Sequence, residues 1–97
     1  MRIMGLDPGD ARIGVAVSDP LGITAQAVGV IQRTEIGKDV ARVTELCGQY
    51  GVEMIVVGLP LEMSGRTGPR AEAAMAFAAR LREALAVPVT TWDERLS

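Results

Sequence analysis

The stretch IMGLDPGDARIGVAVS, residues 3–18, decides the fold of this chain. Its first part, residues 2–7, is a short apolar run that ends on Asp7. From Ile13 to Val17, larger apolar side chains alternate with small ones at the two-residue period of a strand. The turn between the two parts, residues 8–11, contains proline and glycine. We therefore predict two antiparallel strands joined by a tight turn, with a carboxylate at the end of the first strand.

The rest of the chain predicts an alternating α/β domain. A turn at residues 19–22 precedes a weakly alternating third strand at 23–31, which completes an antiparallel meander. Apolar residues at helical spacing predict helices at about 38–50 and 69–86. The apolar run at 54–57 is typical of a central strand covered by helices on both faces of the sheet, and residues 87–92 form a fifth strand.

Length and composition predict a single domain spanning residues 1–97. Of the 97 residues, 48% are hydrophobic, which is enough for one modest core. No apolar run approaches the roughly 20 residues of a membrane helix, and the N-terminus reaches Asp7 too early for a signal peptide. We expect a cytoplasmic protein with no membrane partner. The single cysteine, Cys47, falls in a helical pattern and is interpreted as a buried apolar residue, which leaves no disulfide or zinc site.

The charge balance limits how nucleic acid could be bound. A net charge of −2 argues against binding through bulk electrostatics, because such domains usually carry a basic face. Locally, however, several arginines each lie beside a predicted strand end or a glycine-rich loop: Arg12, Arg66, Arg70 and Arg95. They predict a small basic rim, and the alternative is that they are ordinary solvated side chains.

Two carboxylates follow predicted buried strands, Asp7 after the first and Glu94 after the last. Strand ends at one edge of an open α/β sheet are where such proteins bind ligands. If the two side chains meet, carboxylates about 4 Å apart repel by roughly 4 kcal/mol, so they share a proton or recruit a divalent cation. The chain has no histidine, so any acid–base work falls to carboxylates and a metal. The alternative is a plain hairpin turn and a surface charge cluster.

Two glycine-containing segments predict a place for an anion. Gly9 can let a phosphate or a metal approach the backbone, and Arg12 can pair with that phosphate. The loop at residues 58–70 carries Arg66 and Arg70 and opens onto a helix N-terminus, where free N–H groups attract anions. It lacks the lysine and the spacing of a P-loop, so ATP hydrolysis of that type is not expected. Alternatively, its apolar residues simply pack beneath it.

Four ordered motifs together resemble the YqgF family, over nearly the whole chain. They are LDPG with RIGVA within residues 6–16, DPLG at 19–22, VGLPL followed by Gly65 and GP within 57–69, and WDERLS at 92–97. Members of this family are bacterial Holliday junction resolvase-like proteins, also described as pre-16S rRNA nucleases. The resemblance implies a ribonuclease H-like fold, with a five-stranded mixed sheet that begins with three antiparallel strands and is flanked by helices.

The resemblance also implies metal-dependent hydrolysis of phosphodiester bonds, with Mg²⁺ or Mn²⁺ as the cofactor. Asp7 and Glu94 would be the catalytic metal ligands, and Asp93 would be a further ligand or a neighbour of one. Contacts to the phosphate backbone of the nucleic acid are assigned by position to Gly9, Arg12, Arg66 and Arg70. The implied substrates are the 5′ end of pre-16S rRNA, in ribosome biogenesis, or branched DNA.

The chain departs from the family pattern at its end. Family members continue into a C-terminal helix that supplies a third acidic ligand, whereas this sequence stops at Ser97. We expect a truncated domain with weak or no activity, and an apolar surface that favours a homodimer. Two other interpretations stay open. One is a non-catalytic nucleic-acid-binding module on the same fold. The other is a fragment of a nucleotide-binding domain of the actin and sugar-kinase type, which has a similar aspartate-glycine hairpin.

Overall fold

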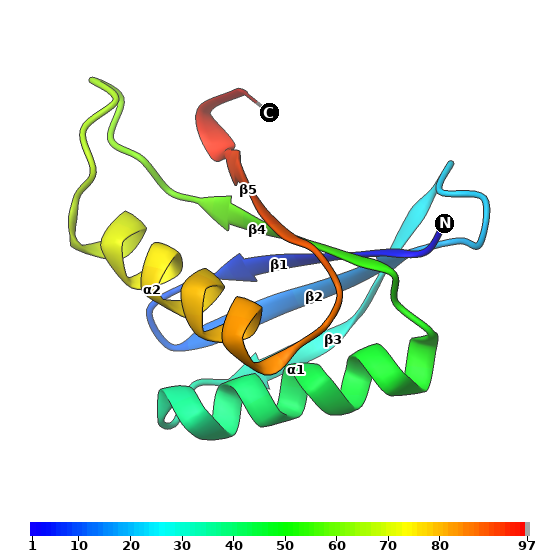
Figure 1. The fold of residues 1–97 in the computed structure, drawn as a ribbon. Helices are drawn as coiled ribbons and strands as arrows, with labels where there is room; N and C mark the ends of the chain where they lie inside the picture. The colour runs from blue at the N-terminus through cyan, green and yellow to red at the C-terminus, as the bar shows by residue number, and fades with distance from the viewer. Residues whose placement is uncertain (97) are drawn as a thin grey trace.

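The computed structural model describes residues 1–96, except for the side chain of Leu96, and contains one five-stranded sheet with two α-helices (Figure 1). In chain order the elements are β1 (Ile3–Pro8), β2 (Arg12–Ser18), β3 (Ala25–Gln32), α1 (Ile36–Tyr50), β4 (Met54–Leu59), α2 (Pro69–Ala84), β5 (Val89–Asp93) and the 3₁₀ turn η1 (Glu94–Leu96).

The strand order across the sheet is β3-β2-β1-β4-β5. β1 pairs antiparallel with β2, and β2 pairs antiparallel with β3, whereas β4 runs parallel to both β1 and β5. The predicted mixed sheet, with its three antiparallel strands first, is confirmed. Since β1, β4 and β5 run the same way, their carboxyl ends lie at the same edge, and the residues that follow them come together there.

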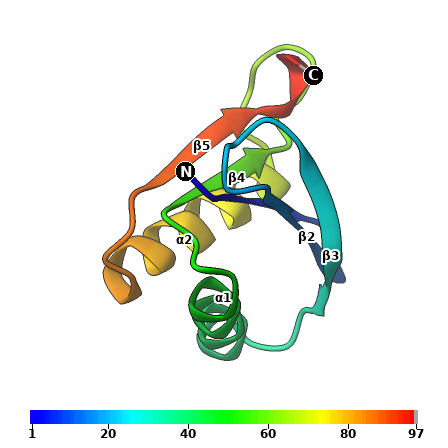
Figure 2. The same ribbon diagram turned by 90° about the vertical axis from the view of Figure 1, so that its right-hand side faces the viewer.

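Both helices pack on the same face of the sheet, as Figures 1 and 2 show. Alternate strand residues face them and form the core with the apolar sides of the helices, for example Met4, Ile13, Ile55 and Phe77, which are all fully buried. The prediction of helices on both faces is not met within residues 1–96. On the opposite face, which we call the open face, the strands carry mainly small residues, and Val56 at its centre is only half-buried.

The third strand begins at Ala25, two residues later than predicted, because the side chain of Asp19 organises the preceding loop. Its carboxylate accepts hydrogen bonds from the backbone N–H groups of Leu21 (2.9 Å), Ile23 (3.2 Å) and Thr24 (2.9 Å). These bonds, together with the Thr24 hydroxyl as the largest contributor, hold the pKa of Asp19 well below its usual range. Residues up to Thr24 therefore belong to the turn.

The helices agree with the sequence prediction except at their ends. α1 begins at Ile36 rather than at residue 38, and buried Asp39 accepts a hydrogen bond from the N–H of Thr34 (3.2 Å) just before the helix. α2 begins at Pro69 as predicted and ends at Ala84, because Leu85 is extended. Cys47 is buried on α1, as predicted, and burial raises the pKa of its thiol. Within the described residues, no helix is long and apolar enough to cross a membrane.

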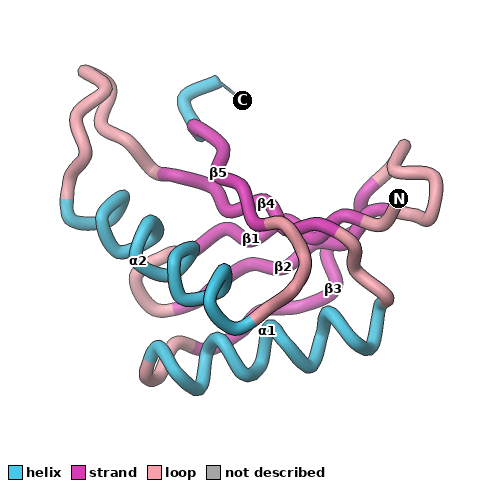
Figure 3. The backbone as a smooth tube through the Cα atoms, viewed as in Figure 1, coloured by secondary structure: helices cyan, strands magenta, loops and turns pink. Residues whose placement is uncertain are grey.

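The long loop between β4 and α2 lies at the same end of the sheet as the segment that follows β5 (Figure 3). Arg95 ties the two together, because its guanidinium donates a hydrogen bond to the carbonyl oxygen of Met63 (3.4 Å). This end of the molecule is therefore formed by the β1–β2 turn, the 60–68 loop and η1.

Candidate active site

Asp7 lies near the carboxyl end of β1, with its side chain exposed on the open face. Its partner across the antiparallel pair is Gly14, and a β-carbon there would lie 3.6 Å from that of Asp7, an ordinary contact. The following turn is closed by the N–H of Gly9, which donates to the carbonyl oxygen of Arg12 (2.7 Å). The strand ending and the turn thus present the Asp7 carboxylate to solvent.

Arg33, just after β3, holds this turn from outside and was not singled out from the sequence. Its guanidinium donates to the carbonyl oxygen of Gly9 (2.6 Å), and its N–H donates to that of Ala11 (3.0 Å). Nothing in the local sequence around Arg33 signals this role, because Arg33 comes close to the turn at Gly9 and Ala11 only through the pairing of β2 with β3. The contact fixes the position of the backbone directly after Asp7.

Glu94 begins η1 directly after β5, and its carboxyl group meets that of Asp7. The pKa of Glu94 rises from 4.5 to about 6, first because burial disfavours the charged form. A hydrogen bond to Asp7 and the charge of Asp7 raise it further, and nearby Arg70 opposes the rise. The structure therefore brings together the two carboxylates that the sequence placed at separate strand ends, and the raised pKa favours a protonated Glu94 in mildly acidic conditions.

A cavity of about 270 Å³ surrounds this pair of carboxylates. It gathers five of the seven residues assigned to the site from the sequence, and its full lining is Asp7, Pro8, Gly9, Arg12, Gly14, Val30, Pro60, Arg70 and Glu94. Two arginines, one glycine turn and two carboxylates thus line one concave surface. This combination suits a phosphate group bridged to the carboxylates by a cation.

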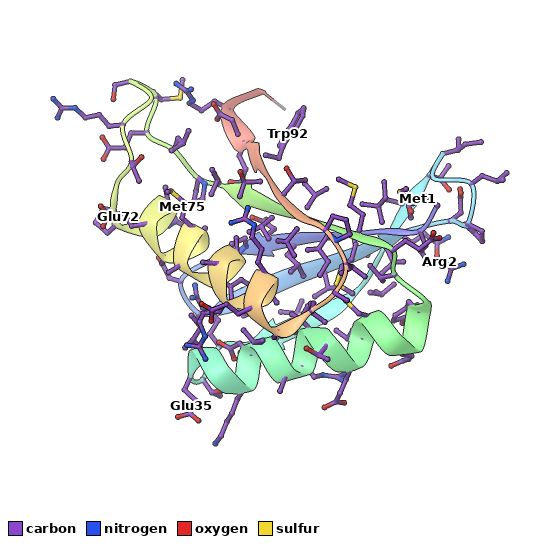
Figure 4. The ribbon with its side chains drawn as sticks, viewed as in Figure 1. Met1, Arg2, Glu35, Glu72, Met75 and Trp92 are labelled. Carbon is purple, nitrogen blue, oxygen red and sulfur yellow. The ribbon has the colours of Figure 1, made fainter. Side chains whose placement is uncertain are left out.

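An apolar groove of about 490 Å³ continues from the carboxylates along the open face. It is lined by small strand residues such as Gly5 and Ala16, by Val56 and by Trp92. Trp92 is half exposed, and Figure 4 shows it on the side of the sheet away from α1 and α2. The sequence analysis assigned no role to this tryptophan, although it lies only two residues before Glu94 and both residues line the groove.

The side chain of Asp93 has a different partner from that of Glu94. Its carboxylate pairs with the guanidinium of Arg95, with 2.6 Å from Oδ2 to Nη2 and 3.0 Å from Oδ1 to Nε. These hydrogen bonds hold the pKa of Asp93 below its usual range. Among the residues that the structure describes, no group of three or more acidic, histidine or cysteine side chains is arranged to hold a metal ion. The ligand role of Asp93 stays a prediction, and this structure engages it with Arg95 instead.

The predicted phosphate contacts differ in whether they line the cavity around the two carboxylates. Arg70, in the first turn of α2, forms an ion pair with Asp10 (3.3 Å) as well as acting on Glu94. Arg66 is exposed within the 60–68 loop, where its carbonyl oxygen accepts a hydrogen bond from the N–H of Glu62 (3.1 Å). Arg66 does not line the cavity around the carboxylates, whereas Arg12 and Arg70 do.

The residues present fit a divalent cation. Asp7 and Glu94 together offer carboxylate oxygens, the donors that Mg²⁺ and Mn²⁺ prefer. Both side chains line the same cavity, and the charge of Asp7 contributes to the raised pKa of Glu94, so a cation between them would be attracted by both carboxylates. The mixed five-stranded sheet, with this acidic pair at the carboxyl ends of its parallel strands β1 and β5, defines a domain of the ribonuclease H-like class.

Comparison with known proteins gives the family. The family model described as "RuvX: Holliday junction resolvase" matches residues 1–97, and the chain belongs to this family. A protein of Syntrophomonas wolfei named "Putative pre-16S rRNA nuclease" is 55% identical over 97 residues, which are the whole of this chain and 69% of the relative. The resemblance inferred from the four motifs is confirmed.

Solved structures agree on the fold. A structure described as "T. thermophilus RuvC in complex with Holliday junction substrate" matches with a TM-score of 0.69 and 20% identity, over 98% of this chain and 66% of that chain. A hexokinase of the ROK type from Thermus thermophilus matches with a TM-score of 0.62 and 24% identity, over 96% of this chain and 34% of that chain. At these identities the likeness shows the ribonuclease H-like fold and leaves the chemistry to the site.

Proposed function

We propose that this chain is the catalytic domain of a metal-dependent nuclease that hydrolyses phosphodiester bonds in the 5′-end processing of pre-16S rRNA. The single observation that carries the proposal is the meeting of Asp7 and Glu94 beside Arg12 and Arg70 in one cavity. The name of the Syntrophomonas relative supports rRNA as the substrate. Since the chain spans 69% of that relative, the activity of the whole relative is part of the proposal.

Each residue of the proposed site has a separate role in binding the metal or the phosphate. Asp7 and Glu94 would hold Mg²⁺ or Mn²⁺, which would bind in place of the proton on Glu94. When bound, the metal supplies Lewis-acid stabilisation of the phosphate and lowers the pKa of an attacking water. Arg12 and Arg70 orient the phosphate backbone, and the open turn at Gly9 leaves room for it.

Arg70 has a competing partner, because it is already paired with Asp10 (3.3 Å). This ion pair is well exposed and therefore weak, so a phosphate can replace Asp10 as the partner of Arg70 at little cost. We expect Asp10→Asn to strengthen nucleic-acid binding modestly, since it removes both the competitor and a nearby negative charge.

The test is cleavage of a labelled pre-16S rRNA 5′ leader with Mg²⁺ or Mn²⁺, against EDTA. The parent chain is compared with Asp7→Asn and Glu94→Gln, and with Glu45→Gln as a control that removes an exposed carboxylate on α1, where it pairs with Arg42 (3.2 Å). The same substitutions are made in the parent chain and in a version extended through the family's C-terminal helix. In whichever version cuts, we expect the cutting to depend on the metal, to fall by orders of magnitude in the first two variants and to persist in the control. Equal cutting by Asp7→Asn and the parent would reject the catalytic assignment.

A version extended through the family's C-terminal helix belongs in the same assay, because the sequence resemblance assigns a third acidic ligand to that region. Cutting by the extended version alone would confirm the nuclease and show that two carboxylates are insufficient. Metal-independent binding of RNA without cutting by either version would favour the non-catalytic module.

A second candidate substrate is branched DNA, which the description of the matching family model favours. A four-way DNA junction in the same assay distinguishes it from rRNA. The third interpretation, a fragment of a nucleotide-binding domain, is tested by measuring ATP binding. The proposed nuclease site does not predict that ATP binds.

A further inference from the structure

Asp7 and Glu94 meet although their strands are not neighbours. In the sheet order, β4 lies between β1 and β5. Neighbouring strands are about 4.8 Å apart, so β1 and β5 are separated by about 10 Å. An aspartate on one and a glutamate just after the other can therefore touch only if a side chain crosses over β4.

The residue of β4 at this crossing is Gly58. The register pairs Leu6 with Val57, which places Gly58 one step further, beside Asp7. On its other side Gly58 pairs with Trp92, two residues before Glu94. Gly58 thus occupies the position on the open face between the two carboxylates, and it lines the groove together with both of them.

Any side chain at Gly58 would occupy the space that Glu94 uses. A β-carbon built there would lie 3.0 Å from Cδ and 3.2 Å from Cγ of Glu94, and closer still to Oε1. The need is for space and not for an unusual backbone, because Gly58 is absent from the described glycines with positive φ.

We propose that Gly58 is a positioning residue of this site: its missing side chain leaves open the passage over β4 through which Glu94 reaches Asp7. For the metal, this inference rests on the proposed function, whereas the placement of Glu94 is independent of it. The substitution Gly58→Ala would push the Glu94 carboxylate out of the passage. Since the carboxylate is the far end of a flexible side chain, it would rotate away and the fold would persist.

Gly5 offers a matched control. It lies on the same open face, in the neighbouring strand β1, and lines the same groove. A β-carbon at Gly5 would meet nothing within 4 Å. Gly5→Ala therefore makes the same chemical change to the same surface without touching Glu94, and it isolates the effect of the passage from any general effect of a methyl group on the sheet.

The experiment measures the position of Glu94 and the affinity for Mn²⁺ separately. Crystal structures of the two alanine variants should show Glu94 rotated away from Asp7 in Gly58→Ala only. By calorimetric titration, Mn²⁺ affinity should fall about 10- to 100-fold in Gly58→Ala, the range for lost supporting contacts of a metal site, and stay near that of the parent in Gly5→Ala. Thermal melting of both variants should resemble that of the parent.

A coupling test completes the design. In a Glu94→Ala background, Gly58→Ala should change Mn²⁺ affinity no further, because the side chain it displaces is already gone. An unmoved Glu94 in Gly58→Ala, or equal losses from Gly58→Ala and Gly5→Ala, would overturn the inference. If neither the parent nor the version extended through the family's C-terminal helix binds Mn²⁺, the proposed function falls, and the position of Glu94 in Gly58→Ala then decides the placement inference alone.

Discussion

Replacing Asp7 by Asn should lower the pKa of the Glu94 carboxyl group from about 6 toward, but not to, its ordinary value of 4.5. The substitution removes the charge that repels ionised Glu94, and the neutral amide can donate a hydrogen bond to the ionised form. Burial, the largest cause of the rise, remains, and the opposing effect of Arg70 also remains. The expected pKa therefore lies between the two values.

The assay is a pH titration of the Glu94 side-chain carboxyl ¹³C signal by NMR, in the parent and in Asp7→Asn. Glu45→Gln, which removes a carboxylate on α1 away from the cavity, should leave the titration of Glu94 unchanged. If Glu94 still titrates near 6 in Asp7→Asn, the two carboxylates are not neighbours in solution, and the structural basis of the proposed site is refuted.

The same pair gives a stability effect with a definite sign. Because the folded-state pKa of Glu94 is raised, its contribution is fully present below pH 4.5 and is lost as pH rises through about 6. A rise of this size corresponds to about 2 kcal/mol at most. Glu94 is only partly buried, so screening by solvent should reduce the effect to about 1 kcal/mol or less. Urea unfolding at pH 4 and pH 7 should show this loss in the parent and not in Glu94→Gln.

Further predictions concern the core, the turn, the metal and the open face. Phe77→Ala removes a fully buried side chain and should cost about 3–5 kcal/mol in urea unfolding, with a cost under 1 kcal/mol contradicting the packing. Arg33→Ala removes the 2.6 Å hydrogen bond to the carbonyl oxygen of Gly9 and should lower the free energy of unfolding by about 1 kcal/mol. Hydrogen exchange of the Gly9 amide should become faster, and an unchanged exchange rate would contradict the role of Arg33 in holding the turn. Mn²⁺ affinity should rise with pH through about 6 as Glu94 loses its proton, and a flat calorimetric profile would contradict this. The homodimer expected from the sequence stays a prediction; sedimentation should show association that Trp92→Glu weakens, and a monomer at all concentrations would exclude it.

The sequence predicted those features that depend on local periodicity. Alternation within residues 3–18 sufficed for β1 and β2, and strand endings sufficed to place Asp7 and Glu94 at one edge of the sheet. It did not predict where β3 begins, because the loop before it is set by hydrogen bonds to a single side chain, Asp19. Nor did it predict the partner of Asp93, since that ion pair depends on Arg95 folding back onto the strand.

The role of Gly58 illustrates why some site residues are invisible before the topology is known. From the sequence, Gly58 merely marks the end of an apolar run, and the structure continues β4 through it to Leu59. Only the order β1-β4-β5 shows that one strand separates the two carboxylates. Two acidic side chains on either side of a central strand require that strand to present almost no side chain where they cross. In this sheet, therefore, the residue that makes the acidic pair possible is the one that contributes no chemical group to it.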